Sequence, residues 1–235
     1  YYYEEELEGL KGEYQEQIDE AEENGDSVKA DELRSELAEE LRSWNEDIEE
    51  KGYASWEGFL AKWNEHLSRR LSPLRTADIG DMIVEVDSRY LDEDAPSLEQ
   101  AVLSLKQGPF TLPTEDEWEY LCNGGTRTLF RWGDTLSGVM TEIFNVGAVG
   151  ETRENKILEQ PNMLGLFIAY DSYKNEIIDN TSFTKGGDGG CSLCGGDGAI
   201  YVLPCYTAFY RQPTNERHSE LSKNYFCYRR IIRLT

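Results

Sequence analysis

The sequence is poor in basic residues and has no long apolar run. Its 235 residues include 23 Lys and Arg against 46 Asp and Glu, a net charge of −23. Nucleic-acid phosphates and anionic membrane surfaces attract basic faces, so we expect neither as a partner. A membrane span needs about 18 to 20 consecutive apolar residues, which the sequence lacks, so we expect no span. With 39% apolar and 11% aromatic residues the chain is nevertheless rich enough for one well-packed domain plus an appendage.

Cysteine is present in an odd number. The five cysteines are Cys122, Cys191, Cys194, Cys205 and Cys227. An odd count in a chain of this size points away from a disulfide framework. Four of them lie within residues 191–235, and this clustering requires a separate explanation.

The acidic residues are concentrated near the start of the chain. Residues 1–70 hold 22 Asp and Glu against 8 Lys and Arg, whereas residues 201–235 hold 2 against 6. Apolar residues recur at steps of three and four in residues 4–22 and again in residues 28–48. Asn24-Gly25-Asp26 is a turn sequence between them. The pattern predicts an antiparallel helical hairpin with acidic outer faces. Solvation is the ordinary reason for such acidity, and a site for a basic partner is the alternative.

Further helices and strands are predicted after the hairpin. Ser55 is positioned to cap a third helix that ends before Pro73. Residues 82–86 have the composition of a strand, and Ser97 with Gln100 marks another helix start. Thr114 and Glu117 form a capping box for a short helix, which Gly124 and Gly125 end. Apolar and aromatic runs at 199–203 and 225–234 predict strands around a long loop.

The motif at the helix that Thr114 caps resembles that of a known family. Leu112-Pro-Thr-Glu-Asp-Glu-Trp-Glu-Tyr120, followed by Gly124-Gly125 and Phe130-Arg-Trp-Gly133, resembles the formylglycine-generating enzyme (sulfatase-modifying factor) domain. Later pieces follow in that family's order: Pro161-Asn162, Gly165-Leu166, Lys185-Gly186-Gly187 and Tyr228-Arg-Arg-Ile-Ile-Arg233. The resemblance covers residues 80–235 and implies a C-type-lectin-like α+β fold.

Several family sites are altered here. The family's Gly-Asn-x-Trp-Glu-Trp, which helps to hold a calcium ion, is replaced by Ser172-Tyr-Lys-Asn-Glu-Ile177, where only Glu176 is retained. Asn145 and the Val146 carbonyl resemble the family's other calcium ligand pair, and an ordinary turn asparagine is the alternative. The two histidines form no His-x-x-x-His or similar pattern, so the ligands of the iron-dependent branch of the superfamily are missing.

Cys191 and Cys194 lie three residues apart in a glycine-rich segment. Two thiols at this spacing can hold a soft metal ion or form a redox pair. In formylglycine-generating enzymes two cysteines of this region bind copper(I) and carry out the oxidation. Cys191 matches the first of these positions, but Cys194 comes two residues too early for the second. A copper-dependent oxidase that uses Cys191 with Cys194 or Cys205 is therefore one hypothesis. A structural zinc clip, completed by Cys205 and His218, is another.

The segment Gly186–Tyr210 favours a different branch of the same fold. Variable proteins of diversity-generating retroelements display a C-terminal stretch that is randomised at adenines, typically in Asn codons. Such changes cannot produce Lys, Glu, Gln, Met or Trp, and none of these occurs between Gly186 and Tyr210. The clustered cysteines would then be products of diversification. Exposed aromatic and small polar residues also suit ligand binding. The residues expected to contact the ligand are Cys191, Cys194, Tyr201, Tyr206, Phe209, Tyr210, Arg211, Asn215, His218, Asn224 and Tyr225. Core packing is the alternative for each aromatic one.

The sequence as a whole predicts a recognition protein. We expect an acidic helical hairpin with a third helix over residues 1–74 and a C-type-lectin-like α+β domain over residues 75–235. The expected ligand is a protein or a surface structure, and no cofactor is required; copper belongs only to the oxidase alternative and calcium to the Asn145 site. The hairpin is expected to mediate self-association or attachment to a particle. This interpretation implies a virion or cell-surface location.

Overall fold

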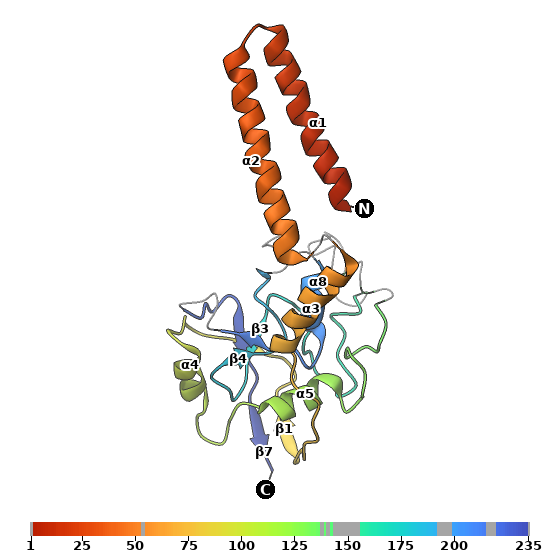
Figure 1. Ribbon diagram of the computed structural model, residues 1–235. Helices are drawn as coiled ribbons and strands as arrows, with labels where there is room; N and C mark the ends of the chain where they lie inside the picture. The colour runs from red at the N-terminus through yellow and green to blue at the C-terminus, as the bar shows by residue number, and fades with distance from the viewer. Residues whose placement is uncertain are drawn as a thin grey trace. The chain divides into compact units, whose positions relative to one another are not determined.

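The computed structural model describes residues 2–52, 55–136, 139, 142, 156–191, 199–214 and 220–234. The chain divides into two compact units, Tyr1–His66 and Leu67–Thr235. The elements are a mixture of helices and short strands, so the predicted α+β class is confirmed (Figure 1). Each unit is described separately below.

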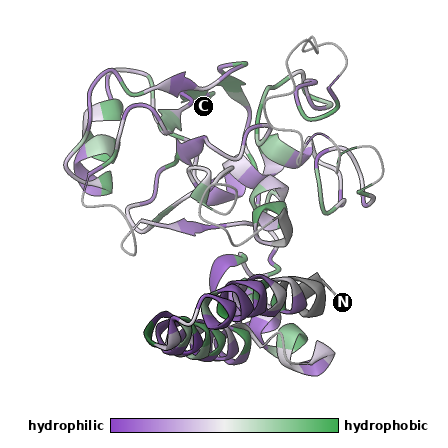
Figure 2. Cartoon of the chain, turned by 90° about the horizontal axis from the view of Figure 1, so that it is seen from above, coloured by the Kyte–Doolittle hydropathy of each residue, from purple (hydrophilic) through white to green (hydrophobic). Residues whose placement is uncertain are grey.

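The first unit contains the predicted hairpin. Helix α1 spans Tyr2–Glu23 and helix α2 spans Ser27–Lys51, and they run side by side (Figure 1). The side chain of Asp26 caps α2 by accepting a hydrogen bond from Lys29 N at 3.0 Å. Near the turn the two helices bury a small apolar cluster, and hydrophilic residues dominate the rest of their surfaces (Figure 2). The cluster consists of Ile18, Ala21, Ala30 and Leu33.

Helix α3 spans Trp56–Arg70, and Ser55 caps it by accepting a hydrogen bond from Gly58 N at 2.9 Å, as predicted. The boundary between the units falls inside this helix rather than after residue 74. The reason is that its last turn pairs with the C-terminal segment: Arg211 N donates to Arg70 O, and Ser72 N donates to Phe209 O. These backbone contacts attach the end of α3 to the second unit.

The described residues of the second unit form three small sheets. Strands β1 (Met82–Val84) and β7 (Ile231–Arg233) pair antiparallel, and β2 (Arg89–Tyr90), β6 (Phe226–Tyr228) and β3 (Asn175–Ile177) form a mixed sheet in that order. Strands β4 (Phe183–Thr184) and β5 (Gln212–Pro213) form the third. The predicted strands near residue 82 and over 225–234 are confirmed. The first strand of the unit therefore pairs with its last.

Two helices precede the central part of this unit. Helix α4 spans Leu98–Leu105, and its N-cap Ser97 accepts a hydrogen bond from Gln100 N, as predicted. Helix α5 spans Glu115–Asn123 and has the predicted capping box: Thr114 N donates to Glu117 at 2.7 Å, and Glu117 N donates to Thr114 Oγ1. Gly124, in the left-handed conformation, ends the helix. These caps fix the carboxylates of α5 that are described below.

The prediction of a strand over 199–203 is wrong. The chain forms a short helix α8 (Ala199–Val202) followed by a 3-10 helix η2 (Leu203–Tyr206). Pro204 lies in the first turn of η2, where its missing N–H costs nothing. Val202, Cys205 and Tyr206 come together on one side by helical spacing and enter a core cluster with Phe130 and Leu158. Tertiary packing thus outweighs the strand propensity of this run.

Candidate binding face and its anchors

The glycine-rich segment that follows β4 is fixed by close backbone packing. A Cβ atom on Gly187 would lie 2.2 Å from the Lys174 carbonyl oxygen, and one on Gly190 would lie 2.1 Å from the Tyr173 ring. Gly186 has a φ of +81° and lies against the Trp118 ring. A side chain does not fit at Gly187 or Gly190, because the segment that contains Tyr173 and Lys174 lies too close. This end of the predicted variable stretch has one well-defined position.

Polar contacts complete that attachment. Asp188 N donates to Ser172 O at 2.9 Å, and the Asp188 carboxylate accepts a hydrogen bond from Gly190 N at 2.8 Å. With the Asn175 amide oriented to suit its neighbours, its nitrogen donates to Gly187 O at 2.8 Å and its oxygen accepts from Gly189 N at 3.2 Å. The backbone polar groups of the segment are thereby paired with a buried side chain, as the interior requires.

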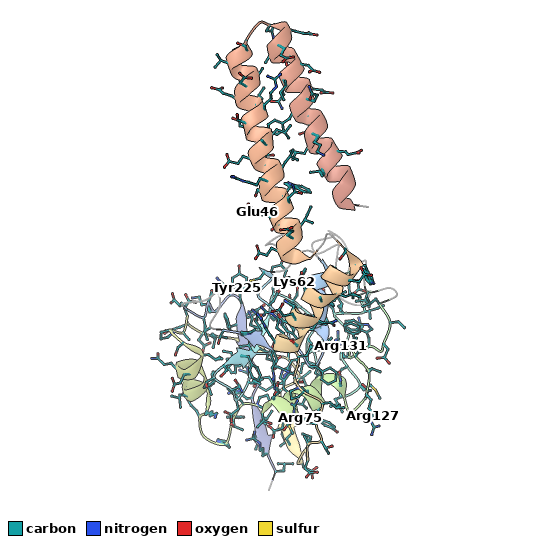
Figure 3. All side chains as sticks on the ribbon, in the orientation of Figure 1. Glu46, Lys62, Arg75, Arg127, Arg131 and Tyr225 are labelled. Atoms are coloured by element: carbon teal, nitrogen blue, oxygen red, sulfur yellow. The ribbon has the colours of Figure 1, made fainter. Side chains whose placement is uncertain are left out.

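One carboxylate on α5 joins the two ends of the stretch. Lys185 Nζ lies 3.2 Å from Glu115 and 2.8 Å from Glu119. Arg211 binds the same Glu115 through two hydrogen bonds of 2.7 Å each. Lys185 and Arg211 are the residues immediately before and after Gly186–Tyr210. Glu115 therefore holds the two ends of this stretch together. Arg75 also binds Glu119, at 3.2 Å, and Figure 3 shows it beside α5.

Burial and charge act in opposite directions at this ionic cluster. Burial lowers the pKa of Lys185, whose side chain is 0% exposed, and this effect exceeds the opposing effects of Glu119 and Glu115. For Glu115, burial alone would raise the pKa, but the hydrogen bonds and charges of Arg211 and Lys185 hold it below its usual range. The carboxylates and cations therefore favour each other's charged forms.

The residues predicted to contact a ligand have different environments. Cys191, Tyr201, Phe209 and Arg211 are partly exposed, Asn224 is exposed, and Tyr225 is 43% exposed. The guanidinium of Arg211 also lies over the Phe183 ring at 4.9 Å, so this residue positions the face as well as bordering it. Cys194, Asn215 and His218 lie outside the described residues, as do Asn145 and Val146 of the expected calcium site.

Tyr206 and Tyr210 are buried, which corrects the prediction that they belong to the ligand-binding face. Their exposed fractions are 2% and 3%, and both belong to the cluster with Phe130, Val139 and Leu158. The Tyr210 hydroxyl donates to Gln212 at 2.6 Å. Burial raises the pKa of Tyr206 to about 12. For these two positions the alternative of core packing holds.

The thiols are mostly buried. Cys122, Cys191, Cys205 and Cys227 are free cysteines, and only Cys191 among these four is partly exposed. Burial raises the pKa of Cys122 and of Cys227 to about 12 and that of Cys205 well above its ordinary value. Metal ligation and nucleophilic chemistry require the thiolate, which this environment disfavours. Within the described residues no cluster of three or more His, Cys, Asp or Glu side chains is arranged to hold a metal ion.

Glu176, the residue retained from the family's calcium motif, has a protein partner. Its carboxylate binds Arg229, and both side chains are buried. The sequence alone did not identify this pair or the Glu115 cluster. A signal was present only for Lys185, a charged residue at the start of a glycine-rich segment, because Glu115 lies among other acidic residues and Arg229 lies beside Arg230.

Comparison with known proteins identifies no family for this chain. No family model, curated protein or solved structure matches this chain. In the part of the chain that the structure describes, no helix combines the length and apolar character needed to cross a bilayer.

Proposed function

We propose that this protein is a non-catalytic binding protein that recognises a protein or surface ligand through its C-terminal segment. The proposed architecture is a C-type-lectin-like domain related to the formylglycine-generating enzymes. The contacts between the motifs support this relation. Gly186 lies against Trp118, and Lys185 binds Glu119, so two motifs that are far apart in the sequence meet.

The observation that carries the proposal is the attachment of both ends of Gly186–Tyr210 to Glu115. The described residues of this stretch, 186–191 and 199–210, include two kinds. Gly187, Gly190 and Tyr206 are fixed by packing, whereas Cys191, Tyr201 and Phe209 retain exposed surface. Binding loops on rigid attachment points are a common way to place variable side chains on a constant scaffold. We propose the same division here, in the manner of a diversity-generating retroelement variable protein.

The state of the thiols favours binding over oxidation. A copper oxidase that paired Cys191 with Cys205 would need the Cys205 thiolate, but that thiol is fully buried and its pKa is raised by burial. The remaining form of the alternative uses Cys191 with Cys194. It is tested by oxygen uptake with a cysteine-containing peptide and copper(I). We expect no uptake above that of free copper, and sustained uptake that is lost in Cys191→Ser would replace the binding proposal.

The retroelement origin has a direct test in the coding DNA. We expect a nearby, near-identical template repeat that differs from the codons of residues 186–210 only at adenines. The positions that differ should include the codons of the partly exposed residues Tyr201 and Phe209 and should spare that of Gly187. Absence of the repeat, or differences at bases other than adenine, would leave only a lectin-like binding protein without diversification.

We further propose that the hairpin α1–α2 attaches the domain to a larger particle or to other copies of itself. Its apolar residues recur at helical spacing, and a hairpin of two helices buries few of them. Sedimentation of the whole chain and of a chain that starts at Ser55, after α2 and before α3, distinguishes the two roles. Self-association that requires the hairpin would favour assembly, whereas a monomer in both forms would favour attachment to another partner. The corresponding location is a virion or cell surface.

A further inference from the structure

A groove on the second unit lies between helix α4 and the extended chain that precedes it. One wall is the segment from Leu91 to Pro96, and the other is α4 with the turn at residues 107–110. Its volume is about 1030 Å³. Pockets for small ligands have volumes of about 300 to 1000 Å³, so this groove has room for a ligand the size of a short peptide.

The bottom of the groove is apolar. Leu91 and Ala101 are buried beneath it, and Leu105 and Tyr228 are half-buried along it. Phe110 lines the groove and is 36% exposed. These side chains provide apolar and aromatic contact area that a ligand can cover.

The one basic side chain in the groove, Arg230, already has a carboxylate partner. It donates two hydrogen bonds to Glu85 Oε1, of 3.1 Å from Nε and 2.6 Å from Nη2. Its guanidinium lies over the Phe110 ring at 4.4 Å. Arg230 therefore contributes shape and an aromatic stack, but its positive charge is compensated.

The acidic side chains of the opposite wall are only partly used. Asp94 accepts a hydrogen bond from Lys223 N at 2.7 Å, which ties this wall to the turn before β6. Asp92 and Glu93 are exposed, and neither has an ion pair or hydrogen bond with the residues that the structure describes. The uncompensated charge of the groove is therefore negative, beside an apolar floor.

We propose that this groove binds a peptide segment in which a Lys or Arg side chain stands next to an aliphatic or aromatic one. The cation would lie against Asp92 and Glu93, and the apolar side chain would cover Leu105, Phe110 and Tyr228. Charge complementarity selects a basic peptide over an acidic one. This site is separate from the C-terminal face, because it shares no residue with the set from Cys191 to Tyr225 that was predicted to contact the ligand, and it does not depend on the proposed function.

The test uses the whole chain and a fluorescent peptide with blocked ends, Leu-Lys-Phe-Lys-Leu, beside the acidic analogue Leu-Glu-Phe-Glu-Leu. Fluorescence anisotropy measures each affinity for the native protein, for D92N/E93Q and for the control E99Q. Glu99 is an exposed carboxylate of α4 that does not line the groove. All three substitutions keep the shape of an exposed side chain, so folding is retained, and matching urea midpoints verify this.

We expect the basic peptide to bind the native protein and E99Q equally and D92N/E93Q about tenfold more weakly, as the loss of two exposed charge contacts implies. The acidic helices α1 and α2 retain all their charges in every variant, so non-specific attraction to them cannot produce this difference. Equal affinity for the double variant and the control would overturn the proposal. So would equal binding of the acidic peptide, or no binding of the basic peptide.

Discussion

Arg229 and Glu176 form an ion pair in the interior of the second unit. Arg229 Nε donates to Glu176 Oε1 at 2.7 Å, and the exposed fractions of the two side chains are 0% and 5%. The remaining guanidinium N–H groups donate to the backbone carbonyls of Glu85, Val86 and Phe167. One side chain thus connects the strand that carries Glu176, the chain after β1 and the loop before residue 170.

Removal of the positive partner is expected to be costly. Arg229→Met leaves the Glu176 carboxylate buried without a counter-ion, which costs about 3 to 5 kcal/mol when a buried pair is broken. We expect a loss of this size in the free energy of unfolding, measured by urea denaturation. The matched control is the double variant R229M/E176L, in which no charge is left unpaired and the loss should be smaller. A single variant that is as stable as the native protein would show that the pair does not contribute to the fold.

The tight packing of Gly187 predicts a large difference between two glycines. A Cβ on Gly187 would lie 2.2 Å from the Lys174 carbonyl, while nothing lies within 4 Å of one on Gly80, and neither residue has a positive φ. We expect Gly187→Ala to lower the free energy of unfolding by about 2 kcal/mol or more, in the range of overpacked sites, and Gly80→Ala to change it by less than about 0.5 kcal/mol. Similar effects of the two substitutions would contradict the proposed anchor.

Two tyrosines of the predicted face, Tyr206 and Tyr225, differ in burial and should therefore differ in their contribution to stability. Tyr206→Ala should destabilise the domain by about 3 to 5 kcal/mol, the range for large aromatic side chains in a core. Tyr225→Ala removes a side chain that is 43% exposed and should change stability by less than about 1 kcal/mol. Thermal unfolding of the two variants compares them directly. A stable Tyr206→Ala variant would return that residue to the binding face.

Some of this arrangement could be predicted from the sequence and some could not. The hairpin, the caps of α4 and α5 and the closing strands follow from local patterns, because caps and periodicity depend on neighbouring residues. The pairs Lys185–Glu115 and Arg229–Glu176 join residues that are 70 and 53 positions apart, and no local pattern specifies such partners. The spacing of Val202, Cys205 and Tyr206 did contain a helical signal, but the branched and aromatic residues favoured a strand.

Thiol reactivity should follow burial. In the native protein we expect Cys191 to react quickly with a thiol reagent, while Cys122, Cys205 and Cys227 react only as the protein unfolds. Cys191→Ser should therefore remove one fast-reacting thiol, whereas Cys205→Ser should leave the fast phase unchanged. A fast phase that is lost in Cys205→Ser would indicate that the core around Tyr206 opens readily.

Stability should fall in acid through the paired carboxylates of α5. Burial alone would raise the pKa of Glu117, but hydrogen bonds from Arg233 and from Thr114 N hold it below its usual range. The carboxylate of the unfolded chain has a pKa of about 4.3, so this contribution is complete above that value and is lost as the pH falls through the lower folded-state value. We expect the urea midpoint to decline below about pH 5, and less steeply in Glu117→Gln. An equally steep decline in that variant would assign the effect to other groups.

The pairing of β1 with β7 has a consequence for how the domain is made. Strand β1 begins at Met82, whereas its partner strand β7 ends at Arg233, about 150 residues later in the sequence. Thr111 also pairs with Ile231 of β7. While the protein is being synthesised, β1 emerges from the ribosome long before β7 and must wait unpaired. Arg229, which neutralises Glu176, arrives at the same late stage. Chains that stop short of residue 226 would lack both β7 and Arg229, so premature termination within Gly186–Tyr210 would yield polypeptides that cannot complete the fold and are open to proteolysis.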